Sequence, residues 1–598
     1  MCGHGAGPAA AGSSGEGAHW ITFRLHRDIR CGAGRARRHP EGVRSTRSPF
    51  RTPLEPSLEP SPPPGDPPLT RLIRRLHELA PDTLRGLLRG IEKESLRARS
   101  DGLLADTPHP AGLGSALAHP RITTDFSESQ LELITDVHSG AQGCLAELAE
   151  IHQVVYREIG QELLWVASMP CGLPADERIP LARYGTSNVG RAKTVYRQGL
   201  SHRYGRRMQT ISGIHYNFSL PPSAWASLQR ADGDAGSEQD YRTAAYFSLI
   251  RNFRRHSWLL LYLFGASPAV CRSFLEGQPH RLQPLGGDTL YLPEATSLRM
   301  GPLGYQSDAQ AALAVSFNSL ENYAASLARA MAEPYPPYER IGIHDGGGLY
   351  RQLATTLLQI ENEFYGTIRP KRTIRPGERP LHALAERGVE YVEVRCLDLD
   401  PFEPVGISLA TLRFLDVFLL HCLLADSPPD SAEEIAAISR NQHGVAQYGR
   451  DPALRLRRGP EQVGVAQWGR ALLAQCEPIA AALDAAAGAA GSPHRDALAA
   501  AAAALEDPSL TPSARSLREM SREFGDSFPR FALARSRRTR DEFLARPPAP
   551  EIAARYAAMA AESLREQRRI EEGDALPFEE YRQRYLAGEL SRVDGGVR

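Results

Sequence analysis

The chain of 598 residues has very little lysine, no net charge, no Cys-x-x-Cys pair and no long apolar run. Its 70 basic and 70 acidic residues cancel, so no overall field attracts nucleic acid or an anionic membrane. The most apolar run, Trp258–Phe264, is far shorter than the roughly 20 residues that a membrane-spanning helix needs. These absences favour a protein that acts on small molecules and binds neither nucleic acid nor membrane.

The eight cysteines are scattered along the chain. This spacing argues against a disulfide framework and a zinc knuckle, and it fits the reducing cytoplasm, where we expect the protein to be. Only Lys93, Lys193 and Lys371 among the 70 basic residues are lysine, and the others are arginine. Each lysine is therefore of interest, because a compact ammonium group suits a phosphate as a point charge.

Composition divides the chain into three parts. Residues 1–68 are rich in Arg and Pro, cannot bury a core and are predicted to be a disordered extension. Residues 69–425 contain both strand and helix patterns and are expected to form a catalytic α+β region. Residues 426–598 are predicted to be mainly helical and to pack on that region.

Three segments alternate between polar and apolar residues, as half-buried β-strands do. In 388–396, Glu393 and Arg395 fall on the face opposite to the valines. In 214–220 the polar face carries His215, and in 90–96 Glu92 and Glu94 share one face. Helical patterns dominate beyond Pro401. The pattern predicts an α+β fold with a curved, mostly antiparallel sheet backed by helices, and a helical C-terminal third.

Residues 167–210 are rich in Gly, Arg and Tyr and are predicted to be a loop. Within them, Gly185–Lys193 has the glycine spacing of a phosphate-binding P-loop, but Arg191-Ala192 stands where Lys-Ser/Thr is required. This argues against a Walker-type NTPase, and no strand-bounded G-x-G-x-x-G supports a dinucleotide site. Asp345–Gly348 is predicted to be a turn.

The polar faces collect acids and one histidine. Hard cations such as Mg²⁺ or Mn²⁺ take oxygen ligands, and nucleotide phosphates can complete their shells. An alternative stays open at each position, because a single acid is more often solvated or paired, and a Glu-x-Arg in a strand is usually a surface ion pair. The acids and histidine are Glu92, Glu94, Asp125, Glu132, His215 and Glu393, and the cationic candidates for phosphate are Arg299, Arg369, Lys371, Arg372 and Arg395.

Many segments between residues 70 and 425 resemble, in order, bacterial glutamate–cysteine ligases of the proteobacterial type. The strand at 388–396 is one of them. The others are Gly90–Arg97, Ile122–Phe126, Leu164–Cys171, Tyr184–Arg191, Tyr196–Leu200, Met208–Pro221, Tyr262–Pro268, Gln359–Tyr365 and Ile368–Arg372.

The resemblance implies a sheet related to that of glutamine synthetase. It implies ATP-dependent joining of the L-glutamate γ-carboxyl to the L-cysteine amine through a γ-glutamyl phosphate, the first step of glutathione biosynthesis, with Mg²⁺ or Mn²⁺. By motif, the six acids and histidine above would be metal ligands. Arg395 and Arg299 would be catalytic, and Arg369, Lys371, Arg372 and Arg395 would bind phosphate. The residues expected around the amino-acid substrates are Phe126, Tyr196, Arg197, Gln209, Arg299, Tyr305 and Tyr365.

Three alternatives stay open: a related carboxylate–amine ligase with another amine acceptor, a phosphotransferase on a similar sheet, and an inactive metal- or nucleotide-binding protein. The chain departs from the family in residues 1–68, which have no counterpart, and at Lys93, where arginine is usual. Similarity is weak beyond residue 470, so the C-terminal helices are given no role. We expect a monomer whose partners are glutamate, cysteine and ATP.

Overall fold

The computed structural model describes residues 68–304, 308–311, 313–488 and 491–590. The prediction of a disordered extension at 1–68 falls outside these residues, apart from Pro68. Among the described residues, no helix combines the length and hydrophobicity that a bilayer crossing demands.

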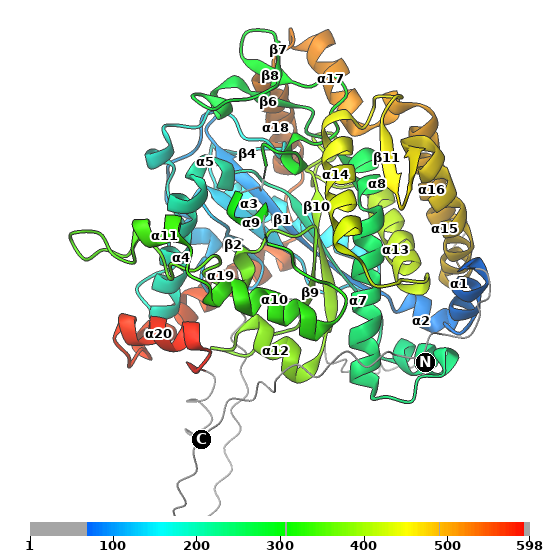
Figure 1. Ribbon diagram of the computed structural model, residues 1–598. Coiled ribbons are helices and arrows are strands. Elements are labelled where there is room, and N and C mark those ends of the chain that lie inside the picture. Colours follow the sequence, from blue (N-terminus) through cyan, green and yellow to red (C-terminus); the bar gives the residue numbers. More distant parts are fainter. Residues whose placement is uncertain (1–67, 305–307, 312, 489–490, 591–598) are drawn as a thin grey trace, which may run out of the picture.

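A seven-stranded antiparallel sheet lies at the centre of the molecule (Figure 1). Its strand order is β2-β3-β1-β5-β10-β9, and β4 pairs with β1 beside this path. Every pairing is antiparallel, which confirms the predicted α+β class. The strands are β1 Leu88–Ala98, β2 Ile122–Thr124, β3 Gln130–Ile134, β4 Leu163–Leu164, β5 Ile214–Ser219, β9 Ile368–Lys371 and β10 Tyr391–Leu397.

The register brings the predicted polar residues onto one face. Glu94 of β1 lies opposite Glu132 of β3, and Glu92 lies opposite His215 of β5. Directly opposite residues in an antiparallel pair point to the same side of the sheet. The four side chains therefore share a face.

The other face of the sheet is mostly apolar, and it also carries Arg89, which pairs with Asp416, and Lys93. Val392, Val394, Tyr216 and Phe218 are fully buried there in the main hydrophobic cluster. Four helices pack on or behind this face: α3 Ala141–Glu158, α7 Glu238–His256, α8 Trp258–Phe264 and α13 Leu409–Leu424. Since a fully buried large aliphatic side chain contributes about 1.5–3 kcal/mol, this face carries much of the stability.

The remaining helices surround this core. Before residue 425 they are α1 Pro68–His77, α2 Pro81–Arg85, α4 Asn188–Tyr204, α5 Arg206–Gln209, α6 Ser223–Asp232, α9 Asp308–Ala311, α10 Leu320–Ala332, α11 Pro336–Ile341 and α12 Pro380–Arg387. After it they are α14 Ala432–Tyr448, α15 Val465–Ala487, α16 Pro493–Glu506, α17 Pro512–Glu523, α18 Phe528–Ala545, α19 Pro550–Glu572 and α20 Phe578–Ala587. Two small sheets pair β6 Ala269–Cys271, β7 Gln283–Leu285 and β8 Thr289–Tyr291, and β11 Arg455–Arg458 with β12 Glu461–Gly464. The domain boundary at residue 425 stays a prediction.

The predicted loop at 167–210 is wrong in its second half, where α4 and α5 lie. The side chain of Ser187 caps α4 by accepting a hydrogen bond from the backbone N–H of Gly190. The hydrophobic pattern did not predict helix α4 because the inward side of this helix is polar. Lys193, Tyr196 and Arg197 line a cavity there instead of an apolar core.

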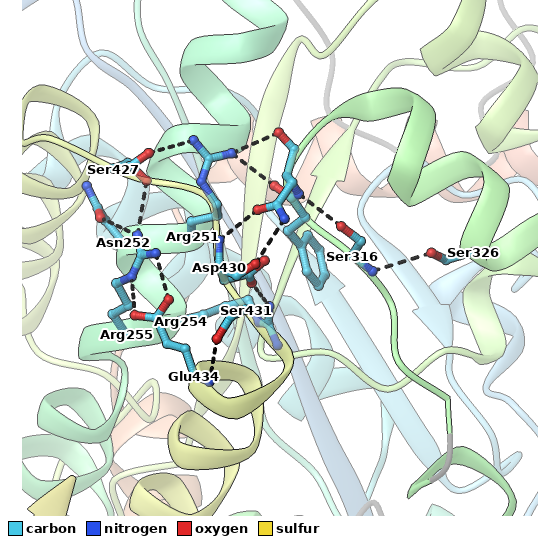
Figure 2. A network of polar contacts seen from close by, with 12 residues as sticks. Arg251, Asn252, Arg254, Arg255, Ser316, Ser326, Ser427, Asp430, Ser431 and Glu434 are labelled. Atoms are coloured by element: carbon cyan, nitrogen blue, oxygen red, sulfur yellow. Dashed lines mark hydrogen bonds and ion pairs between the residues drawn. The ribbon is translucent and has the colours of Figure 1, made fainter. Parts of the chain in front are cut away.

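A polar network ties α7 to two connecting segments (Figure 2). Arg251 donates to the backbone carbonyls of Phe317 at 3.1 Å and Ser427 at 2.9 Å. Arg254 pairs with the carboxylate of Asp430 at 3.0 Å. These bonds fix the connection between α13 and α14 against α7, so the C-terminal helices begin from a rigid position.

His119, just before β2, is buried in a neutral form. Its Nδ1 accepts hydrogen bonds from the backbone N–H groups of Arg121 at 3.1 Å and Ile122 at 2.9 Å. A protonated ring could accept neither bond. Burial, reinforced by the neighbouring His109 and Arg121, lowers the pKa of His119 from 6.5 to about 3.

We predict that His119 makes the fold acid-sensitive. Because the folded-state pKa lies below the unfolded value, the stabilisation is complete above pH 6.5 and is lost as the pH falls toward about 3. Between pH 7 and pH 5, His119→Asn should lose less stability than the wild type, by about 2 kcal/mol. Urea unfolding at the two pH values measures this difference, and parallel losses in both proteins would contradict the prediction.

Candidate active site

A cavity of about 190 Å³ lies over the polar face of the sheet. Strands β1, β2, β3, β5, β9 and β10 contribute to its lining, together with helices α4 and α20. The charged and aromatic residues that line it are Glu92, His119, Asp125, Glu132, Lys193, Tyr196, Arg197, His215, Arg369, Lys371, Glu393, Arg395, Tyr581 and Tyr585.

His215 is at the centre of the acidic cluster. Its Nδ1 lies 3.2 Å from Glu92 Oε2 and 3.8 Å from Glu393 Oε1, and its Nε2 lies 3.6 Å from Glu94 Oε1. One ligand atom from each of Glu92, Glu132 and His215 fits within 4.8 Å of the others. Glu94 does not line the cavity; its Oε2 accepts from the backbone N–H of Gly213 at 2.8 Å.

Burial and mutual repulsion hold some of these carboxyls in their protonated form. Burial first, and the charges of Glu92, Asp125 and Glu94 next, raise the pKa of Glu132 well above its ordinary value. Burial and Asp125 raise the pKa of Glu94 to about 8. Carboxyls that repel one another in this way, beside an imidazole, are a donor set that fits a divalent cation.

Glu393 has the opposite environment. Burial alone would raise its pKa, but Lys371, Arg395 and His215 bring it well below the ordinary value. Lys371 Nζ lies 3.1 Å from Glu393 Oε1, and Arg395 Nη1 lies 3.1 Å from Glu393 Oε2. One ionised carboxylate therefore holds two cations at the cavity wall.

Two of the three lysines line this cavity, as a phosphate role requires, and the third does not. Lys193 lies over the Tyr184 ring at 4.6 Å, and burial lowers its pKa to about 7. Lys93 alternates to the apolar side of β1, where its Nζ lies 2.7 Å from His152 Nε2. No phosphate role follows for Lys93.

Several predicted site residues lie behind the lining. Arg299 is buried and donates to the backbone carbonyl of Arg395 at 2.9 Å, so it supports the strand that carries Arg395. Gln209 donates to the Tyr365 hydroxyl at 2.8 Å, and neither residue lines the cavity.

Three further residues that were predicted to belong to the site are not found among the described residues that line the cavity. Phe126 is buried and is not part of the lining. Arg372 lies away from the cavity, where it donates to the backbone carbonyl of Arg387 at 3.0 Å and its Nε lies 3.6 Å from Glu390. Tyr305 lies outside the described residues. The structure thus does not bring Arg372 together with the other phosphate candidates.

Helix α20 adds residues that the sequence did not suggest. Tyr581 and Tyr585 line the cavity from this helix, with their rings stacked at 6.2 Å. The helix is anchored by Phe578, which lies under the guanidinium of Arg191 at 4.2 Å, and by Glu579, whose carboxylate accepts from the Tyr350 hydroxyl at 2.7 Å. The i, i+4 spacing of the two tyrosines was a signal, but weak family similarity in this region left it without a role.

Solved structures support the fold and the class. A glutamate–cysteine ligase from Francisella tularensis in complex with AMP superposes with a TM-score of 0.79 at 36% identity, covering 85% of this chain and 98% of that one. A bifunctional glutathione synthetase from Pasteurella multocida gives a TM-score of 0.66 at 28% identity, over 82% of this chain and 58% of that one. Fold and cavity together define an α+β ligase with its candidate site over an antiparallel sheet.

The sequence comparisons identify the family. Its profile, described as glutamate–cysteine ligase, matches residues 73–445. Glutamate–cysteine ligases from Pseudomonas putida (strain W619) and Azotobacter vinelandii are 50% and 51% identical, covering 87% and 86% of this chain and 99% and 96% of theirs. The chain belongs to the glutamate–cysteine ligase family, which confirms the resemblance.

We predict that Gly213→Ala disturbs the support of the site. An added Cβ would lie 2.0 Å from Arg299 Nη2, so the buried guanidinium would have to leave the Arg395 carbonyl. Overpacking of this kind costs about 1–3 kcal/mol. The control is Gly140→Ala, where a Cβ meets nothing within 4 Å. Chemical denaturation should show a loss for Gly213→Ala alone; equal stability of the two variants would refute the packing argument.

Proposed function

We propose that the chain joins the γ-carboxyl of L-glutamate to the amine of L-cysteine at the expense of ATP, the first step of glutathione biosynthesis. One observation carries this proposal: the acidic cluster, Lys371 and Arg395 line the same cavity. The chain that holds them belongs to the glutamate–cysteine ligase family. A free amine and a carboxylate do not condense in water, so the carboxyl must first be activated, here as an acyl phosphate.

We propose Mg²⁺ or Mn²⁺ as the cofactor. Carboxyls that repel one another around an imidazole fit such a cation. The residues that would hold it are Glu92, Glu94, Asp125, Glu132, His215 and Glu393. When bound, it would supply positive charge to the phosphates of ATP. Binding would also offset the burial and the repulsion that raise the pKa of Glu132.

The residues of the chain would handle the transferred phosphoryl group through charge and position. Lys371, Arg369 and Arg395 lie on neighbouring strands β9 and β10 and converge on the cavity. They would neutralise phosphate oxygens while the glutamate γ-carboxylate attacks the γ-phosphorus. The cysteine amine then attacks the acyl phosphate and phosphate leaves. Fixed cations suit this reaction because phosphoryl transfer depends on orientation and electrostatic relief.

Arg197 is suited to a substrate carboxylate. Its guanidinium lies over the Tyr184 ring at 4.6 Å and donates from Nε to the backbone carbonyl of Asp125. Stacking and this bond hold the guanidinium plane at the cavity wall, and Tyr196 lies one residue before it in the lining. Phe126, Gln209, Arg299 and Tyr365 would act from behind the lining, and we propose a cytoplasmic monomer.

The test is an assay with ATP, Mg²⁺, glutamate and a series of amines, read by ADP release and product mass. The proposal requires γ-glutamylcysteine as the main product. A different γ-glutamyl amide would identify a related ligase, and a stable phosphorylated product would identify a phosphotransferase.

We predict that Glu393→Gln reduces ADP release that depends on both amino acids by roughly a thousandfold. The substitution removes the charge that holds Lys371 and Arg395. Glu386→Gln, on the exposed side of α12, is the control and should retain activity. The assay is run on protein whose thermal unfolding remains cooperative, and retained turnover in the Glu393 variant would remove β10 from the mechanism.

We predict a milder effect for the aromatic wall. Tyr581→Leu should raise the KM of at least one substrate roughly tenfold with a smaller change in kcat, because the ring shapes the cavity without meeting the charged cluster. Arg584→Gln, on the same helix and outside the lining, is the matched control. Unchanged KM values for all three substrates would show that α20 serves stability alone.

A further inference from the structure

A second cavity, of about 180 Å³, lies where the loop after β10 meets helices α17 and α18. It shares no lining residue with the cavity over the sheet. Besides two prolines, its walls are Phe402, Arg515, Arg535, Arg538, Thr539 and Glu542. Its volume is enough for a small ligand.

The ring of Phe402 forms the stacking platform of this cavity, on which two of its arginines lie. The guanidinium carbons of Arg515 and Arg535 lie over its ring, at 3.7 and 4.6 Å from the centroid. The ring itself packs against Phe531, with centroids 5.9 Å apart. Stacking fixes a guanidinium plane while its N–H groups, which lie in that plane, remain available to donate.

Positive charge on the cavity wall is only partly compensated. Arg535 pairs with Glu519, with Nε 2.8 Å from Oε1. Among the described residues, the side chains of Arg515 and Arg538 form neither an ion pair nor a hydrogen bond, and both residues are exposed. Glu542 is the one acid in the lining, and its Oε1 lies 3.8 Å from Arg546.

Two further acids, Asp400 and Glu403, lie on the loop within electrostatic reach of Arg515. Neither lines the cavity, so they lower the field without occupying the space beside the guanidinium groups. The cavity therefore presents two arginines without carboxylate partners, a third arginine held in place, and the hydroxyl-bearing Thr539.

We propose that this second cavity binds a small phosphate-type oxyanion, either inorganic phosphate or the phosphoryl group of a small metabolite. Arg515 and Arg538 would donate to its oxygens, with Arg535 held by Glu519 as the fixed third wall. Planar guanidinium groups match the oxygens of a phosphate in paired hydrogen bonds. The ligand would join the loop after β10 to α17 and α18.

The experiment is calorimetric titration of the full chain with inorganic phosphate and, separately, with glycerol phosphate. Arg515→Gln/Arg538→Gln should weaken binding roughly tenfold or more. The matched control, Arg518→Gln/Arg537→Gln, removes the same charge from exposed positions on the same two helices, where each side chain donates to a backbone carbonyl. This control should keep the affinity.

A further arm separates the two cavities, because phosphate could also enter the cavity over the sheet. Arg369→Gln changes that cavity alone and should leave this binding in place. Loss in Arg369→Gln with full binding in the Arg515/Arg538 variant would overturn the proposal, as would absence of binding by both probes. Tighter binding of glycerol phosphate would identify a phosphorylated metabolite, and tighter binding of phosphate the free ion.

Each variant is first melted without phosphate to check that it is folded. Since Arg515 and Arg538 are exposed, folded protein is expected. Phe402→Leu gives an independent variant that removes the stacking platform and leaves every charge in place. It should also weaken phosphate binding, and unchanged affinity in Phe402→Leu would remove the platform from the proposal.

Discussion

The site depends on the burial of like charges on one face of a sheet. Carboxyls on β1, β3 and β10 lie close together away from water, where an isolated ionised group is very costly. The chain meets this cost in two ways. Glu393 is ionised and held between Lys371 and Arg395, whereas Glu132 and Glu94 have raised pKa values. A bound cation would favour the ionised form of Glu132 and Glu94, and a phosphate group could accept from Lys371 and Arg395.

The cost of burying these charges is offset by the other face of the sheet, which is mostly apolar and packs in the main hydrophobic core. On β10, Val392 and Val394 enter the main core while Glu393 and Arg395 turn to the cavity. Helices behind the core resist any slip of the strand, since a shift by one residue would send the valines to the cavity and the charges to the core. The alternation of apolar and charged residues along β10 therefore fixes both the register of the strand and the position of the charged groups at the cavity.

The C-terminal helices contribute to the cavity over the sheet and to the second cavity. Helix α20 closes the cavity over the sheet with Tyr581 and Tyr585, and α17 and α18 frame the second cavity around Phe402. The loop that contains Phe402 continues directly from β10. Strand β10, which carries the ion pairs of Glu393, thus leads into a loop beside the arginines of the second cavity. Helices α17 and α18, which supply these arginines, follow more than 100 residues later in the chain.

The sequence alone determined three central strands, β1, β5 and β10, and their faces, because alternation in a strand is a local property that side-chain polarity reveals. It also predicted which segments carry the metal-binding and phosphate-binding candidates. It missed α4, whose inward side is polar, and it could not separate Arg369 from Arg372, which are three residues apart. Only the tertiary structure decided that Arg369 lines the cavity and Arg372 does not, and that α20 reaches it. Contacts between distant segments depend on packing, which no local pattern records.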